Sequence, residues 1–91
     1  MNMQEVNRQM ISILESWDPL GYGPKAYELE IVDVIQAAHS TTNVEKLARR
    51  IQAIYELSFE DVIPLPMCKM IAKQLVKLIT VSTACEKGLN E

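Results

Sequence analysis

Residues 17–24 read Trp-Asp-Pro-Leu-Gly-Tyr-Gly-Pro. This stretch holds the only tryptophan of the chain, two of its four prolines and two of its three glycines. An Asp first, a Pro second and a Gly fourth is the pattern of a type I turn, which Asp18, Pro19 and Gly21 supply. Pro19 also disfavours the α conformation at the residue before it, so a helix that carries Trp17 must end there.

The rest of the stretch predicts the start of a second helix. The Asp18 carboxylate can accept a backbone N–H two residues on, as in an Asx-turn. Gly23 allows a further bend, and Pro24 suits the first position of a helix, where its missing N–H costs nothing. We therefore expect an ordered structural corner in which only Tyr22 has no assigned role.

Four segments carry apolar residues at three- and four-residue steps, the period of an amphipathic α-helix. They span residues 3–16, 24–39, 43–57 and 66–87. The links are short, which favours antiparallel neighbours. The sequence therefore predicts an all-α fold, a single four-helix domain over residues 1–91, arranged as a roughly antiparallel bundle with its last helix most buried.

Two details of these helices can be tested directly. Thr42 followed by Glu45 three residues later is a capping-box pattern, which predicts Thr42 as the N-cap of the third helix. The last helix is apolar over more than half of its circumference. We place Met67 and Leu78 on its central face and Cys68 at the margin.

Composition limits the class of protein. At 91 residues with 48% hydrophobic residues, the chain is long enough for one packed core, and its net charge of −3 does not favour nucleic acid. The first residues lack a secretory pattern, and no apolar run approaches the ~18 residues of a membrane helix. Cys68 and Cys85 fall about 25 Å apart along one predicted helix, too far for a disulfide. We therefore expect reduced thiols and a cytoplasmic location.

The sequence offers little for catalysis or metal binding. His39 is the only histidine, and no catalytic motif surrounds it in the sequence. Asp18, Glu28, Glu30 and Asp33 form an acidic set, but a capping carboxylate and the wet side of a helix account for it. Phosphate-binding loops, zinc motifs and nucleophile elbows are all missing. We therefore predict no enzyme activity, no catalytic residues, no cofactor and no metal.

A basic cluster on the third predicted helix raises a second class of function. Lys46, Arg49 and Arg50 lie opposite its apolar face, which is compatible with a recognition helix in the major groove of DNA. The acidic balance of the chain opposes this hypothesis, so we expect no nucleic-acid partner.

Protein binding is the better hypothesis. The second helix carries apolar residues on its outer side, and the last helix combines a wide apolar arc with a lysine edge. A large exposed apolar patch marks such sites. The candidate interaction residues are Tyr22, Leu29, Val32, Lys69, Lys73, Val76 and Lys77.

Several motifs together resemble a known family. These are the stretch 17–24, the pair Tyr27-Glu28, the run Ile51-Gln52-x-Ile54-Tyr55-Glu56-x-Ser58-Phe59, and Ile63-Pro64-Leu65. They are similar to the small uncharacterised family typified by the YugE protein of Bacillus. The resemblance implies a cytoplasmic, all-helical bacterial protein without an assigned activity, and it carries over no site residues.

A looser likeness concerns the corner alone. Trp-Asp-Pro-apolar-Gly followed by a tyrosine resembles a motif in proteins that neutralise toxins, although Ala26 stands where an acid is expected before Tyr27. The hypotheses for function are therefore a protein-binding module that self-associates or binds a partner, an immunity-like protein, a ligand binder or enzyme around residues 18–27, and a DNA-binding protein.

Overall fold

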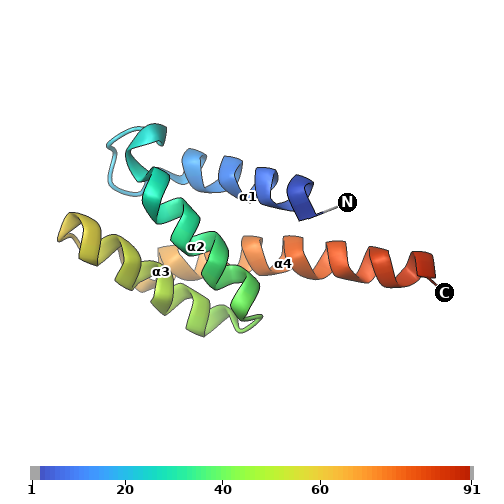
Figure 1. Ribbon diagram of the computed structural model, residues 1–91. Helices are drawn as coiled ribbons and strands as arrows, with labels where there is room; N and C mark the ends of the chain where they lie inside the picture. The colour runs from blue at the N-terminus through green and yellow to red at the C-terminus, as the bar shows by residue number, and fades with distance from the viewer. Residues whose placement is uncertain (1–2, 91) are drawn as a thin grey trace.

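The computed structural model describes residues 3–90, with side chains as far as Ser82 (Figure 1). It contains four α-helices and one 3₁₀ turn, and the described residues form no strand. In chain order the elements are α1 (Met3–Trp17), η1 (Pro24–Tyr27), α2 (Glu28–Ser40), α3 (Val44–Phe59) and α4 (Leu65–Asn90). The all-α four-helix prediction is confirmed.

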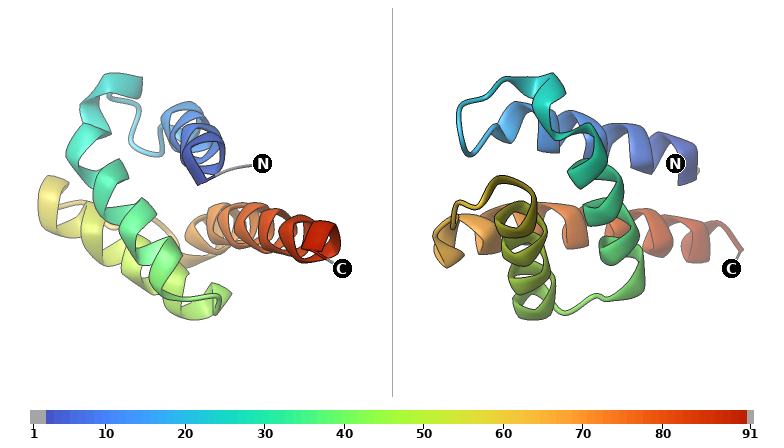
Figure 2. Two further views of the ribbon diagram at one scale, coloured as in Figure 1. Left: turned by 45° about the vertical axis from the view of Figure 1, so that its right-hand side comes forward. Right: turned by 60° about the vertical axis from the view of Figure 1, so that its left-hand side comes forward.

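The long helix α4 organises the bundle because it contacts α1, α2 and α3. The start of α1 and the end of α4 lie at the same end of the molecule, so these two helices run antiparallel (Figure 1). Helices α2 and α3 form a second antiparallel pair that crosses them (Figure 2). Within the described residues, no helix is long and apolar enough to cross a membrane.

The core lies where these four helices meet. Helix α1 contributes the stripe predicted from its period, Val6, Met10 and Leu14, all fully buried. The other helices close over it with further apolar side chains; among the largest are Tyr27, Val34, Leu47, Ile51, Tyr55, Ile63 and Leu75. Burial of each such side chain contributes about 1.5–3 kcal/mol, which is the main favourable term in holding the bundle together.

The structure corrects the predicted helix starts. The second helix begins with the 3₁₀ turn Pro24–Tyr27 before the α-helix proper. Asn43, not Thr42, is the N-cap of α3: its side-chain oxygen accepts from the Lys46 N–H at 2.9 Å. The predicted cap was wrong by one residue because an asparagine there serves the same purpose.

Two further corrections concern α3 and α4. Helix α3 extends to Phe59 and ends where Glu60 adopts a left-handed conformation, φ 54°. The buried side of α4 is centred on Cys68 rather than on Met67, which is 38% exposed. A helix that is apolar over more than half of its circumference does not fix its own rotation, so the packing of its neighbours decides it.

Candidate functional site

The corner between α1 and α2 is held by a pair of side chains, Asp18 and Tyr27. The Tyr27 hydroxyl donates to Asp18 Oδ1 at 2.5 Å. The same hydroxyl accepts from the backbone N–H groups of Leu20 at 3.2 Å and Tyr22 at 3.3 Å. The Asp18 carboxylate accepts from the Gly23 N–H, with both oxygens at 3.2 Å. Two side chains thus satisfy three backbone donors of the loop.

The backbone of the corner explains its composition. Asp18 has φ 35°, a left-handed conformation that Asp tolerates better than most residues. The Gly21 N–H donates to the Asp18 carbonyl at 3.4 Å, which closes the expected turn. Gly23 has φ 97°, which a side chain would strain. The predicted acceptor is right, but its donor is Gly23, not the Leu20 N–H.

Hydrogen bonding and burial shift the acid–base equilibria of this pair. The Tyr27 hydroxyl and, less strongly, the Gly23 N–H hold the pKa of the Asp18 carboxyl below its ordinary value, against an opposing effect of desolvation. Burial first, and then the bond to Asp18, raises the pKa of Tyr27. The pair is therefore an ionised acid and a neutral phenol at neutral pH.

All five aromatic residues of the chain gather beside this corner. The Tyr27 ring lies 5.5 Å from Tyr55 and 5.4 Å from Phe59, centroid to centroid. Trp17 meets Tyr55 edge-on at 5.5 Å, and Tyr22 covers Phe59 at 5.5 Å. Such contacts contribute about 0.5–1.5 kcal/mol each beyond their area. The role that the sequence left open for Tyr22 includes shielding Phe59.

The corner offers only a shallow hollow, of about 370 Å³, lined by Ser12, Glu15, Ser16, Asp18 and Pro24. Of the hydrogen-bonded pair, only Asp18 lines this hollow, and its oxygens already accept from Gly23 and Tyr27. The hydrogen bonds of the corner therefore serve the structure of the loop.

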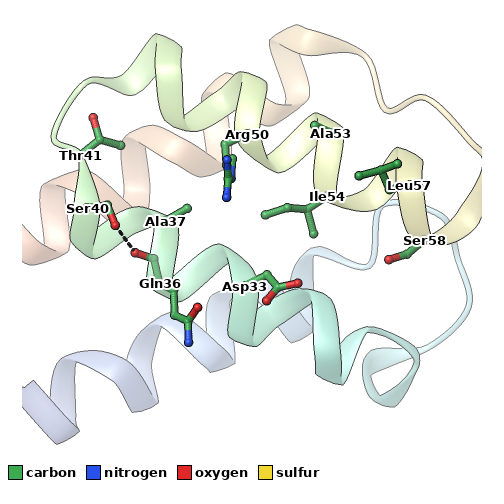
Figure 3. A pocket seen from close by; sticks show the side chains of 10 residues that line it. All are labelled: Asp33, Gln36, Ala37, Ser40, Thr41, Arg50, Ala53, Ile54, Leu57 and Ser58. Atoms are coloured by element: carbon green, nitrogen blue, oxygen red, sulfur yellow. Dashed lines mark hydrogen bonds between the residues drawn. The ribbon is translucent and has the colours of Figure 1, made fainter.

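A larger concavity lies between α2 and α3. It has a volume of about 700 Å³ and is lined by Asp33, Gln36, Ala37, Ser40, Thr41, Arg50, Ala53, Ile54, Leu57 and Ser58. Its walls include two small side chains, Ala37 on α2 and Ala53 on α3, and the side chains of Arg50 and Ile54 extend from α3 toward α2 (Figure 3). We refer to this feature as the α2–α3 groove.

Apolar and charged side chains surround this groove. Leu57 is 85% exposed and Leu29 is 78% exposed, the highest values among the large apolar side chains that the structure describes. Leu29 precedes Asp33 by one helical turn and so lies on the same side of α2. Arg50 points into the space between the helices, with Asp33 on the opposite wall (Figure 3). The groove therefore combines exposed leucines with one charge of each sign.

The other predicted interaction residues are scattered. Val32 is 53% exposed on α2 beside Leu29, and Tyr22 is 57% exposed at the corner. Lys69 forms an ion pair with Glu45 at 3.6 Å. Lys73 and Lys77 are exposed and Val76 is partly buried, all on α4, which does not line the groove. Leu29 therefore lies on the groove side of α2, Val32 is exposed outside the lining of the groove, and the lysine edge is separate from it.

Sequence reasoning missed Leu57. It is the one large apolar residue of α3 outside that helix's core arc, a signal that was present in the pattern. The groove itself left no such signal, because it depends on the spacing between two helices.

Neither His39 nor Cys68 lies in a reactive setting. His39 Nε2 is 2.8 Å from Asn7 Oδ1 on α1, where it ties two helices together. Cys68 is fully buried, and burial raises the pKa of its thiol to about 11. The side chain of Cys85 lies outside the described residues. Among the residues that the structure describes, no group of three or more His, Cys, Asp or Glu could hold a metal ion.

Comparison with known proteins identifies the family. Residues 9–86 match the domain of unknown function DUF1871. The chain belongs to the DUF1871 family. This DUF1871 member is 44% identical over 78 residues to the uncharacterized protein YugE of Bacillus subtilis (strain 168), across 86% of this chain and 90% of YugE. The resemblance noted from the sequence motifs is confirmed.

A solved structure shares the fold of this DUF1871 member. It is the crystal structure of APC36109 from Bacillus stearothermophilus, with a TM-score of 0.84 and 39% sequence identity. The match covers 87% of this chain and 98% of that one. The names of this family and of these two relatives state no activity.

Proposed function

We propose that this chain is a non-enzymatic protein-binding module that contacts its partner through the α2–α3 groove. One observation carries the proposal: of the two most exposed leucines among the described residues, Leu57 lines a concavity of about 700 Å³ and Leu29 lies one helical turn before Asp33, which also lines it. Burying a leucine side chain gains roughly 1.5–3 kcal/mol, so two of them provide a substantial part of a binding free energy.

The absence of a reactive pair supports the non-enzymatic part of the proposal. Asp18, whose pKa is lowered in the folded protein, is bonded to Tyr27 and Gly23, and both bonds serve the loop. The buried Cys68 thiol is predominantly protonated at neutral pH, since its pKa is raised to about 11.

The direct test is crosslinking in living cells of the native host. Leu57 is replaced by a photo-crosslinking phenylalanine analogue, the cells are irradiated, and covalent products are separated by mass. We expect a discrete product, and we expect Leu29→Asp in the same chain to abolish it by placing a charge in the apolar contact.

A matched control uses the same analogue at Arg8 on α1, whose side chain is 76% exposed and outside the groove. It should give no discrete product. If position 57 gives no product at native expression levels, or gives only what position 8 gives, the groove is not a protein-binding surface and the proposal is wrong.

A further inference from the structure

We infer that the occupant of the α2–α3 groove is a second copy of this chain, related by a two-fold axis that runs along the groove. This inference rests on the proposed function, since it names the partner for the same surface. It depends on the two charges of the groove, one acidic and one basic, which can pair with the same two charges of a second copy.

The two charges of the groove have no ion-pair partner among the residues whose side chains the structure describes. The described residues form ion pairs between Arg8 and Glu5, and from Glu45 to both Arg49 and Lys69. Asp33 and Arg50 form none within the described part of the chain, although both line one groove. Both charged side chains are therefore available to pair with charges of a partner.

Asp33 and Arg50 lie at the same level along the groove. Asp33 is seven residues before the end of α2 at Ser40, and Arg50 is six residues after the start of α3 at Val44. At 1.5 Å per residue these positions are about 10 Å and 9 Å from the connection between the helices. Because α2 and α3 run antiparallel, the two side chains stand opposite each other on the two walls (Figure 3).

A two-fold axis along the groove would place α2 of one copy over α3 of the other. Residues at the same level then meet, so Asp33 of each copy faces Arg50 of its partner, and the contact occurs twice. A two-fold axis that runs across the groove at this level would instead place α2 over α2, so that Asp33 faces Asp33 and Arg50 faces Arg50. The charges thus select one arrangement.

The apolar residues follow the same register. Leu29 is eleven residues before the end of α2, and Ile54 is ten residues after the start of α3. In the two-fold arrangement Leu29 of one copy therefore lies over Ile54 of the other. The exposed Leu57 flanks this contact one turn further along α3. The same operation that pairs the charges therefore also covers Leu29 and places Leu57 at the edge of the contact.

Sedimentation equilibrium of the full chain tests the inference. We expect the wild type to form dimers at micromolar to submillimolar concentration, more weakly at high salt because exposed charges are screened. Asp33→Arg and Arg50→Asp each bring two like-charge contacts into the dimer and should weaken self-association at least tenfold. The double variant, which exchanges the two charges, should recover it.

A mixture of the two single variants gives the sharpest result. The Asp33→Arg chain carries two basic groups in the groove and the Arg50→Asp chain two acidic ones. An equimolar mixture should therefore form heterodimers although each variant alone is monomeric. Arg8→Asp, with the same change in net charge on α1, is the control and should form no heterodimer with the Asp33→Arg chain. Far-ultraviolet circular dichroism verifies that each variant is folded.

Three results would overturn the inference: a wild type that stays monomeric at several hundred micromolar and low salt, single variants that dimerise like the wild type, or a mixture that does not associate. The proposed function is judged separately. A crosslinked product at position 57 that contains a different protein would retain protein binding and reject the second copy. No product would reject both.

Discussion

The corner and the α2–α3 groove differ in how far their polar and apolar groups are satisfied inside the chain. At the corner, Asp18 and Tyr27 bond to each other and to the loop, and the aromatic rings cover one another. In the groove, Asp33 and Arg50 have no ion pair among the described residues, and Leu29 and Leu57 are exposed. The polar and aromatic groups of the corner are therefore used within the fold, whereas the charges and exposed leucines of the groove are the ones that we propose contact a partner.

The largest effect should come from removing the anchor of the corner. Trp17→Ala removes a partly buried ring that packs edge-on against Tyr55. We expect a loss of about 3 kcal/mol, the lower end of the range for a large aromatic residue because part of the ring is exposed. Urea unfolding followed by circular dichroism measures it. An unchanged midpoint would show that the corner does not stabilise the fold.

Tyr27→Phe should have the next largest effect. It leaves the ring in place but removes the hydroxyl that bonds Asp18, Leu20 and Tyr22. We expect a loss of about 2 kcal/mol in the free energy of unfolding, because buried or partly buried donors lose their acceptor.

Tyr55→Phe is the matched control for that change. Tyr55 is also fully buried, its ring is 5.5 Å from Tyr27, and its hydroxyl has no hydrogen-bond partner among the described residues. Removing a hydroxyl without a partner should leave stability within about 0.5 kcal/mol or raise it slightly. Equal losses of stability in the two variants would show that the hydrogen bonds of the Tyr27 hydroxyl do not stabilise the fold.

A third prediction concerns acid. The pKa of Asp18 is lowered in the folded protein, so the carboxylate stabilises the fold above its ordinary pKa of 3.8 and this contribution is lost as pH falls through the folded value. The difference in unfolding free energy between wild type and Asp18→Asn should therefore be constant near neutrality and shrink below about pH 4. In a Tyr27→Phe background the shrinkage should be smaller, because the Tyr27 hydroxyl is the main cause of the shift. A difference independent of pH would contradict the assigned contact.

The smallest effect on stability belongs to the groove. Leu57→Ser changes a side chain that is 85% exposed, so we expect the free energy of unfolding to change by less than about 0.5 kcal/mol. The measurement is the urea midpoint at a concentration low enough to keep the chain monomeric. A loss comparable to that of Trp17→Ala would mean that Leu57 packs within its own chain, which would end the contrast between the two regions.

Most of the fold could be predicted from local sequence patterns. The helical period of α1 identified Val6, Met10 and Leu14 as core, and the residues of the turn identified a corner. The sequence patterns did not show how side chains from different elements are placed relative to one another. The period of the second helix does not indicate that the Tyr27 hydroxyl reaches back nine residues to Asp18.

The candidate site was predicted only in part for the same reason. Leu29 and Val32 were identified from their place outside the core face of α2. The groove, with Ala37, Ala53 and the opposed charges of Asp33 and Arg50, arises from the separation and register of two helices. No single helix encodes that arrangement, so the period of either helix could not reveal it.

The corner also has a consequence for how the chain folds. The hydrogen bonds of its side chains join residues only five to nine positions apart, whereas Trp17 and Tyr55 come from helices far apart in sequence. A loop of about ten residues closes in roughly 10–100 ns, well before distant helices dock. The direction in which the chain leaves α1 can therefore be set early. This reduces the number of conformations that the chain samples before α4 docks. We expect the corner to act as an early guide to topology, in addition to stabilising the finished fold.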